Sequence, residues 1–171
     1  TGKLNWLTSI SPRSGRNELE SLRDIEMTPV VKDGIVFAGS FQGNLIAVDT
    51  FNGNLVWSKP MSILSNIDVD AENLYVADSE GYIFALDKFS GFTKWKLELE
   101  NNLIGTQSFS HEKYIINIST KGHVMVIDKN EGKILSLIKM TDDIDNQTKG
   151  IITNKVLYIT SKNGRLNAIK I

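Results

Sequence analysis

Short apolar runs recur along the whole chain, and glycine, aspartate or asparagine bounds most of them. Typical runs are residues 35–38 (IVFA), 45–48 (LIAV), 74–77 (LYVA) and 83–86 (IFAL). Runs this short, rich in β-branched and aromatic residues, are typical of strands, whereas amphipathic helices need a longer pattern with a period of about 3.6 residues. The pattern therefore predicts an all-β chain.

These runs belong to a tandem repeat of about forty residues. The copies align on an anchor glycine, namely Gly43, Gly81, Gly122 and Gly164, with separations of 38, 41 and 42 residues. An aspartate follows the first three anchors by six residues and a second glycine follows them by ten; a tryptophan follows the first two anchors by fourteen. These residues are Asp49, Asp87 and Asp128; Gly53, Gly91 and Gly132; and Trp57 and Trp95, with Ser136 in the third copy.

Each copy has room for four strands, which is the content of one blade of a β-propeller. In the first complete copy the strands are predicted over residues 28–31, 35–40, 44–49 and 54–59. The predicted blades cover residues 27–61, 66–100, 105–141 and 149–171, the last one incomplete. Residues 1–10 are interpreted as the outer strand of a preceding blade, because Gly2 and Trp6 repeat the spacing of Gly53 and Trp57.

The fold class is therefore all-β, a β-propeller fragment of about four four-stranded blades. Two arrangements remain open: the chain is part of a longer propeller, or its first strand completes its last blade, because an open sheet edge would invite aggregation. Residues that recur in every blade are interpreted as structural. We expect the repeat aspartates to bond turn amides and the tryptophans to supply apolar area at blade contacts.

Composition and charge exclude several classes of function. The net charge is -1 and the 19 basic residues are scattered, so no nucleic-acid partner is expected. The chain contains no cysteine, which excludes disulfides and thiolate chemistry. No apolar run approaches the roughly 20 residues of a membrane span.

No metal, cofactor or catalytic site is expected from the residues. His111 and His123 lack a second ligand at a metal-binding spacing and are interpreted as surface or turn residues. The acidic turn at residues 142–146 lacks the glycine of a calcium loop and is interpreted as a loop between blades. No nucleophile with a base and an orienting group stands out, so the chain is not expected to be an enzyme.

The hairpin pattern G-x-L-x-A-x-D followed by x-x-x-G-x-x-x-W resembles the quinoprotein-type (PQQ-like) propeller repeat. The fourth copy departs from it, with Lys170 in place of the aspartate. Residues 16–43 (RNELESLRDIEMTPVVKDGIVFAGSFQG) are more specific. They resemble BamB, a lipoprotein of the outer-membrane β-barrel assembly (BAM) machinery, and the likeness extends over the C-terminal half of that family.

The resemblance implies a non-catalytic scaffold and half of an eight-bladed propeller. It implies a protein in the periplasm, anchored to the outer membrane by a lipid on an upstream cysteine, which is the only membrane contact expected. The implied partner is the barrel subunit of the BAM complex, through its POTRA domains, and unfolded outer-membrane proteins are a further candidate. Self-association of the half-propeller is also considered, because each half has two apolar blade faces to cover.

In the family, a D-x-D pair in the loop before the TPVV strand contributes to docking. The matching positions here are Asp24 and Glu26, with Arg23, Leu22 and Glu20 beside them. The alternative is that residues 11–26 are a solvated connector without a docking role. A second part of the family's docking surface has no counterpart in this chain.

Two readings from other classes of function stay open. One is a fragment of a quinoprotein dehydrogenase, which would need a vicinal disulfide, metal-binding carboxylates and a tryptophan stacked on the propeller axis. The other is a ligand-sensing propeller attached to another domain. The missing part of the protein would distinguish all three, by a lipidated cysteine, a cysteine pair or a transmembrane span.

Overall fold

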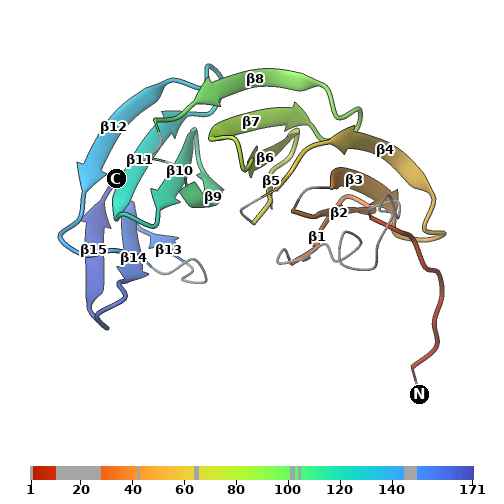
Figure 1. Cartoon of the computed structure of the whole chain (residues 1–171), viewed down its shortest axis with the longest axis horizontal. Helices are drawn as coiled ribbons and strands as arrows, with labels where there is room; N and C mark the ends of the chain where they lie inside the picture. The colour runs from red at the N-terminus through yellow and green to blue at the C-terminus, as the bar shows by residue number, and fades with distance from the viewer. Residues whose placement is uncertain are drawn as a thin grey trace, which may run out of the picture.

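Four antiparallel sheets stand side by side in an arc (Figure 1). The computed structural model describes residues 2–10, 28–41, 43–63, 66–100, 103, 105–144 and 150–171. Within these ranges the chain forms fifteen strands and no helix, which confirms the all-β propeller fold. No helix that could cross a membrane is therefore found in the described part.

Each sheet is a meander in which sequential strands are neighbours. The first contains β1 (Val30–Lys32), β2 (Ile35–Gly39), β3 (Asn44–Asp49) and β4 (Leu55–Pro60). The second contains β5 (Asp68–Val69), β6 (Asn73–Ala77), β7 (Tyr82–Asp87) and β8 (Thr93–Glu98). The third contains β9 (Gly105–His111), β10 (Tyr114–Ser119), β11 (His123–Asp128) and β12 (Ile134–Lys139). The fourth has three strands, β13 (Ile151–Thr153), β14 (Val156–Thr160) and β15 (Leu166–Lys170).

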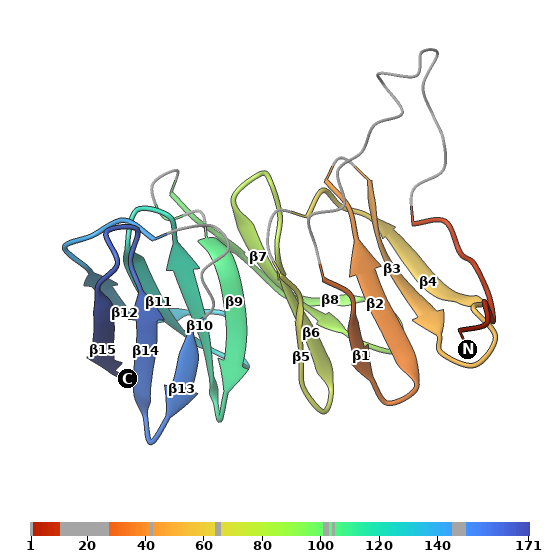
Figure 2. The same cartoon turned by 90° about the horizontal axis from the view of Figure 1, so that it is seen from below.

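The order of the strands determines which strand of each sheet lies next to the central axis of the arc. The first strands β1, β5, β9 and β13 lie on the concave side of the arc, and β4, β8 and β12 form its outer rim (Figure 1). Seen from below, the sheets are stacked face against face (Figure 2). Consecutive strands alternate in direction. The β1–β2 and β3–β4 hairpins therefore lie at one end of the strands, and the connections between blades lie at the other end of the strands.

Local sequence explains the hairpins and the direction of the outer strand. Asp33 and Gly34 both have positive φ, 48° and 76°, the type I′ geometry that two-residue hairpins favour. The register between the third and fourth strands shifts at the same place in three sheets, between Ala47 and Val48 in the first. The extra residue lies in the outer strand, and such a bulge bends that strand, which carries the repeat tryptophan in the first two sheets.

The core lies between the sheets, because alternate residues of the inner strands face opposite neighbours. In the first sheet, Phe37, Leu45 and Ala47 pack against the second sheet, where they meet Leu74 and Phe84. The next residues along β6 and β7 point the other way and pack against the third sheet. A third cluster joins the third and fourth sheets in the same manner. The middle strands of the first three sheets are therefore buried on both sides.

The outer strand of a preceding blade, predicted over residues 1–10, stays a prediction, because no described strand lies beside residues 2–10. Residues 2–10 pair with no described strand, although Trp6 and Ile10 pack on the outward face of the first sheet, against Ile46. A strand needs a partner for its backbone groups, and the described residues offer none at this position. This segment and β15 lie at opposite ends of the arc, so the first segment does not complete the last sheet of its own chain (Figure 1).

Candidate functional site

The repeat tryptophans join the first blade to the second and the second blade to the third. Trp57 of the first blade donates its indole N–H to the carbonyl of Lys88 at 2.8 Å, and Trp95 donates to Lys129 at the same distance. The rings lie on the second glycines, so that a Cβ added at Gly91 would come within 2.9 Å of the Trp57 ring. The spacing of glycine and tryptophan therefore reflects contact between successive blades.

The repeat aspartates bond the amides of their own turns. Oδ1 of Asp49 accepts the amides of Phe51 and Asn52, at 2.9 and 3.1 Å. Asp87 and Asp128 do the same in the next two blades. A hydrogen bond from the Ser90 side chain, reinforced by the turn amides, lowers the pKa of Asp87. These carboxylates are engaged in local structure.

A second link between blades was missed by sequence reasoning. Lys88 is fully buried, and its Nζ donates to Asp33 in the β1–β2 turn of the preceding blade and to the Asp70 carbonyl at 3.2 Å. Lys129, seven residues after its anchor like Lys88, lies 2.5 Å from the Asp70 carboxylate. The sequence contained a sign of this link, because a lysine recurs at the same repeat position in the second and third copies.

These pairs shift the titration of the acids. The hydrogen bond from Lys88 lowers the pKa of Asp33. Burial alone would raise the pKa of Asp70, but Lys129 and the amides of Asn73 and Glu72 outweigh it and hold this pKa at about 2. Both acids therefore stay ionised beside their lysines at neutral pH.

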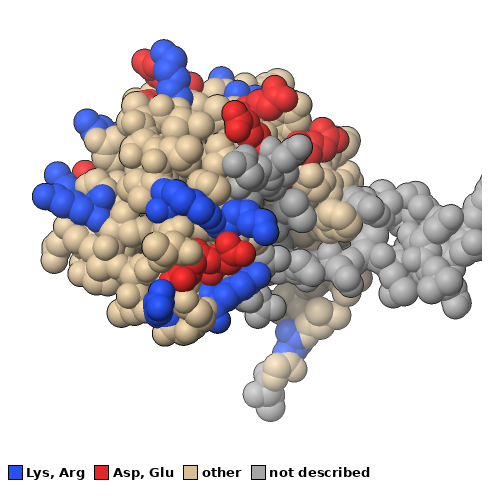
Figure 3. All heavy atoms as spheres, turned by 60° about the vertical axis from the view of Figure 1, so that its left-hand side comes forward, with Lys and Arg blue, Asp and Glu red and all other residues tan. Residues whose placement is uncertain are grey.

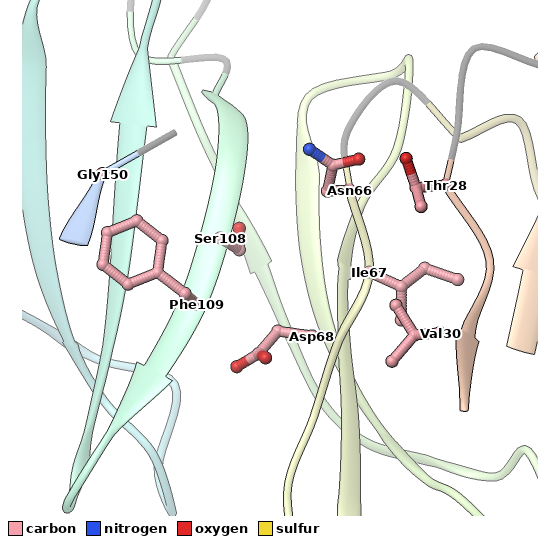
Figure 4. A pocket seen from close by; sticks show the side chains of 8 residues that line it. All are labelled: Thr28, Val30, Asn66, Ile67, Asp68, Ser108, Phe109 and Gly150. Atoms are coloured by element: carbon pink, nitrogen blue, oxygen red, sulfur yellow. The ribbon is translucent and has the colours of Figure 1, made fainter. Parts of the chain in front are cut away.

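A cavity of about 290 Å³ opens between the first strands of the four sheets, toward the axis of the arc (Figure 4). Three pairs of residues line it, each pair from neighbouring blades, with Thr28 and Asn66 at the top. The pairs are Val30 with Ile67, Asp68 with Ser108, and Phe109 with Gly150. Pockets of this size that are mainly apolar with a few polar groups are typical of binding sites.

The middle pair of the cavity is polar where its neighbours are apolar. Asp68 accepts the backbone amide of Ser110, and Ser108 accepts a hydrogen bond of 2.8 Å from the side chain of Asn117. Asn117 is fully buried, and its Oδ1 has no hydrogen-bond partner within the described residues. Neither Trp57 nor Trp95 lines this cavity, since both lie on glycines at the outer strands.

The remaining candidates take structural positions or lie outside the described residues. Asp142 contacts Arg165 at 3.4 Å, and Ile144 in the same turn is buried in the core. His111 ends β9, and His123 begins β11 with its amide bonded to Ser119. The described ranges contain no group of three His, Cys, Asp or Glu side chains that could hold a metal.

The five residues predicted for docking lie in residues 11–27, outside the described residues. They are Glu20, Leu22, Arg23, Asp24 and Glu26. Thr28, which follows this segment, lines the top of the axial cavity. The docking assignment therefore rests on the sequence.

Sequential antiparallel sheets in an arc, the first three joined to one another by tryptophans packed on glycines, define a β-propeller of the PQQ-like repeat class. The family described as outer membrane protein assembly factor BamB matches residues 1–97, and the chain belongs to this family. The assembly factor BamB of Kangiella koreensis is 28% identical over 170 residues, which are 99% of this chain and 44% of that protein. The chain thus spans less than half the length of this curated relative.

Solved structures agree on the fold. The crystal structure of BamB from Moraxella catarrhalis superposes with a TM-score of 0.83 at 22% identity, over 97% of this chain and 49% of that one. The quinohemoprotein alcohol dehydrogenase of Comamonas testosteroni superposes with a TM-score of 0.56 at 21% identity, over 68% of this chain and 21% of that one. Both likenesses concern the propeller fold, which hosts different functions.

Proposed function

We propose that the chain is part of a non-catalytic docking scaffold in the assembly of outer-membrane β-barrel proteins. The observation that carries this proposal is the match of residues 1–97 to the BamB family. The use of the repeat residues supports it: the aspartates and tryptophans that recur in the blades are engaged in turns and blade contacts. What remains for function is a surface of loops on a rigid frame.

The proposed partner is the barrel subunit of the BAM complex, through its POTRA domains, with unfolded outer-membrane proteins as further clients. The protein would act at the periplasmic face of the outer membrane, held by a lipid on a segment upstream of this chain. The mixed charge of the surface fits a protein partner better than nucleic acid. Acidic and basic side chains are interspersed on the face shown in Figure 3, and the net charge is -1.

The docking contact is assigned to Asp24 and Glu26, with Arg23, Leu22 and Glu20 beside them. Two carboxylates separated by one residue suit basic side chains or free backbone amides of a partner. Charges at an interface rim act on register and association rate more than on raw affinity. This segment directly precedes Thr28, which lines the axial cavity, so a partner docked on it would lie beside that cavity.

The test is binding of the 171-residue chain to isolated POTRA domains, measured by surface plasmon resonance at low and high salt. Asp24→Ala with Glu26→Ala is expected to lower the association rate about tenfold at low salt and less at high salt. The matched control is Glu72→Ala with Glu131→Ala, which removes the same charge from hairpins at the opposite end of the strands. Equal effects of the two pairs would refute the docking assignment, and no binding by the unaltered chain would refute the proposed function.

A further inference from the structure

Each junction between two blades has the same three positions at its axial end. The earlier blade supplies the residue thirteen before its anchor glycine, and the later blade supplies those fourteen and five before its own. The three sets are Val30, Ile67 and Val76; Asp68, Ser108 and Asn117; and Phe109, Gly150 and Ile159. Six of these nine residues line the axial cavity. The cavity is therefore built from the junctions inside the arc and not from its two end faces.

The first and third sets contain no polar side chain. The first set packs in the apolar cluster between the first and second blades. Phe109 and Ile159 of the third set pack in the cluster between the third and fourth blades. A Cβ added at Gly150 would lie 3.2 Å from the Phe109 ring, so the ring fills the space beside this glycine. Apolar packing therefore satisfies this place in the fold.

The middle set is polar at all three positions. Asp68 accepts the backbone amide of Ser110, and its side chain reaches from β5 toward β9, the strand that carries Ser108 (Figure 4). Ser108 is 4% exposed and accepts a hydrogen bond of 2.8 Å from Nδ2 of Asn117. Asn117 is fully buried, and its Oδ1 has no partner within the described residues. Burying these groups costs free energy that the other two junctions avoid, which indicates a ligand.

The charge of the lining selects the kind of ligand. Asp68 is the single ionisable side chain among the described residues that line the cavity, and it forms no ion pair within the described part of the chain. Further oxygen acceptors and apolar walls come from Thr28, Asn66 and Ser108, and from Val30, Ile67 and Phe109. The volume of about 290 Å³ lies at the lower end of the range for small-molecule pockets. A carboxylate between apolar walls suits a small organic cation with several N–H donors.

We propose that the axial cavity binds a guanidinium or primary ammonium group on a short apolar stem, with Asp68 as the counter-ion. Asp68 and Ser108 contact the head group, and the stem lies against Ile67 and Phe109. Asn117 is a positioning residue, which holds the Ser108 hydroxyl. A free amine and a basic side chain of a polypeptide offer the same chemistry. The proposal goes beyond the docking assignment, since none of these residues belongs to residues 20–26.

The first measurement compares two probes of one shape, butylguanidinium and the neutral butylurea, by protein-observed nuclear magnetic resonance titration. At about 20 mM salt butylguanidinium is expected to bind about tenfold more tightly than butylurea, and this preference should shrink at high salt. Asp68→Asn is expected to lower the affinity for butylguanidinium about tenfold. Glu80→Gln, which removes the same charge from the exposed β6–β7 turn of the same blade, is the control and should change nothing. Equal affinities for the two probes, or an unchanged affinity in Asp68→Asn, would overturn the proposal.

A second pair of probes distinguishes the two sources of the basic group. These probes are a capped tripeptide with arginine between two valines and the same peptide with neutral citrulline. Tighter binding of the arginine peptide than of butylguanidinium assigns the site to a side chain of a polypeptide, whereas weaker binding assigns it to a free amine. Either order supports a site for a basic group. Binding of neither basic probe refutes it.

The third measurement separates binding from folding. Ser108→Ala with Asn117→Val removes both partners of one buried hydrogen bond, so neither is left unpaired by the change, and valine is the residue of the first junction. Without a probe, the free energy of unfolding in urea is expected to equal or exceed that of the unaltered chain. The affinity for butylguanidinium should fall about threefold to tenfold. Lower stability with an unchanged affinity would assign the polar set to the fold and overturn the proposal.

Discussion

The contact between Trp57 and Gly91 can be tested by adding a single methyl group. Gly91 has a φ of +73°, and a Cβ there would lie 2.9 Å from the Trp57 ring. Gly34 has a nearly equal φ of +76°, but its nearest neighbour, Oγ1 of Thr50, would be 3.9 Å away. Alanine at Gly34 thus carries only the backbone cost, and alanine at Gly91 adds the steric cost of moving an indole.

The two costs can be estimated separately. A left-handed backbone costs about 1–2 kcal/mol for a residue with a Cβ. Overpacking a contact that cannot relax adds about 1–3 kcal/mol. We therefore expect Gly34→Ala to lower the free energy of unfolding by about 1–2 kcal/mol, and Gly91→Ala by about 2–5 kcal/mol.

A double-mutant cycle identifies the ring as the cause. Trp57→Ala is itself destabilising, but in its background the added cost of Gly91→Ala should fall to that of Gly34→Ala. Guanidinium unfolding followed by far-ultraviolet circular dichroism measures all variants, because the signal comes mainly from the backbone and the midpoint can be read without the Trp57 indole. The protein concentration is held constant so that any association is the same. Equal costs at Gly34 and Gly91, or an unchanged cost of Gly91→Ala without the indole, would refute the contact as the reason for the glycine.

Two further predictions concern the lysines between blades. Asp33→Ala should destabilise the protein more than Lys88→Met, because the first change leaves a fully buried ammonium group without its carboxylate. The second change leaves only the Asp33 side chain without its partner, and that side chain is 52% exposed and can be hydrated. Thermal unfolding of both variants measures the order, and the reverse order would contradict the prediction. Asp70 has its pKa lowered to about 2 from 3.8, so its pairing with Lys129 stabilises the fold above about pH 4 and is lost as the pH falls toward 2. Denaturant titrations from pH 5 downward should therefore show a shallower loss of stability in Asp70→Asn, and an unchanged slope would argue against this pair.

The repeat made much of the fold predictable from sequence. Fixed offsets from the anchor glycines place strands, turns and apolar faces, because each blade must fit the same neighbour on either side. Strand ends differ by one or two residues: the first strand was predicted over residues 28–31 and is Val30–Lys32. The outer strand of a preceding blade, predicted over residues 1–10, stays a prediction: Trp6 takes the position of a repeat tryptophan on Gly53, but spacing does not show whether the backbone has a partner.

Contacts between different copies were harder to predict. Lys88 reaches Asp33 across 55 positions, and only the packing of two blades brings them together. The axial cavity was missed for the same reason, because Asp68 and Ser108 belong to no motif and meet only where the first strands converge. The repeat pattern identifies residues that recur in every copy. A site assembled from single residues of several blades can be located only when the arrangement of the blades is known.

Departures from the repeat are consequently where function is best sought. At the first junction Val30, Ile67 and Val76 pack as an apolar contact, whereas the corresponding place in the second junction holds Asp68, Ser108 and Asn117. The first junction shows that an apolar set at that place is compatible with the fold. Burying the Asn117 amide, whose oxygen has no partner among the described residues, is therefore a cost that folding alone does not demand. Residues 20–26 depart from the repeat as well, and the strand that follows them lines the same cavity. The polar junction (Asp68, Ser108 and Asn117) and residues 20–26 should therefore be substituted in one series, with binding and stability measured for each variant. A functional position is one where substitution reduces binding while stability is unchanged or increased.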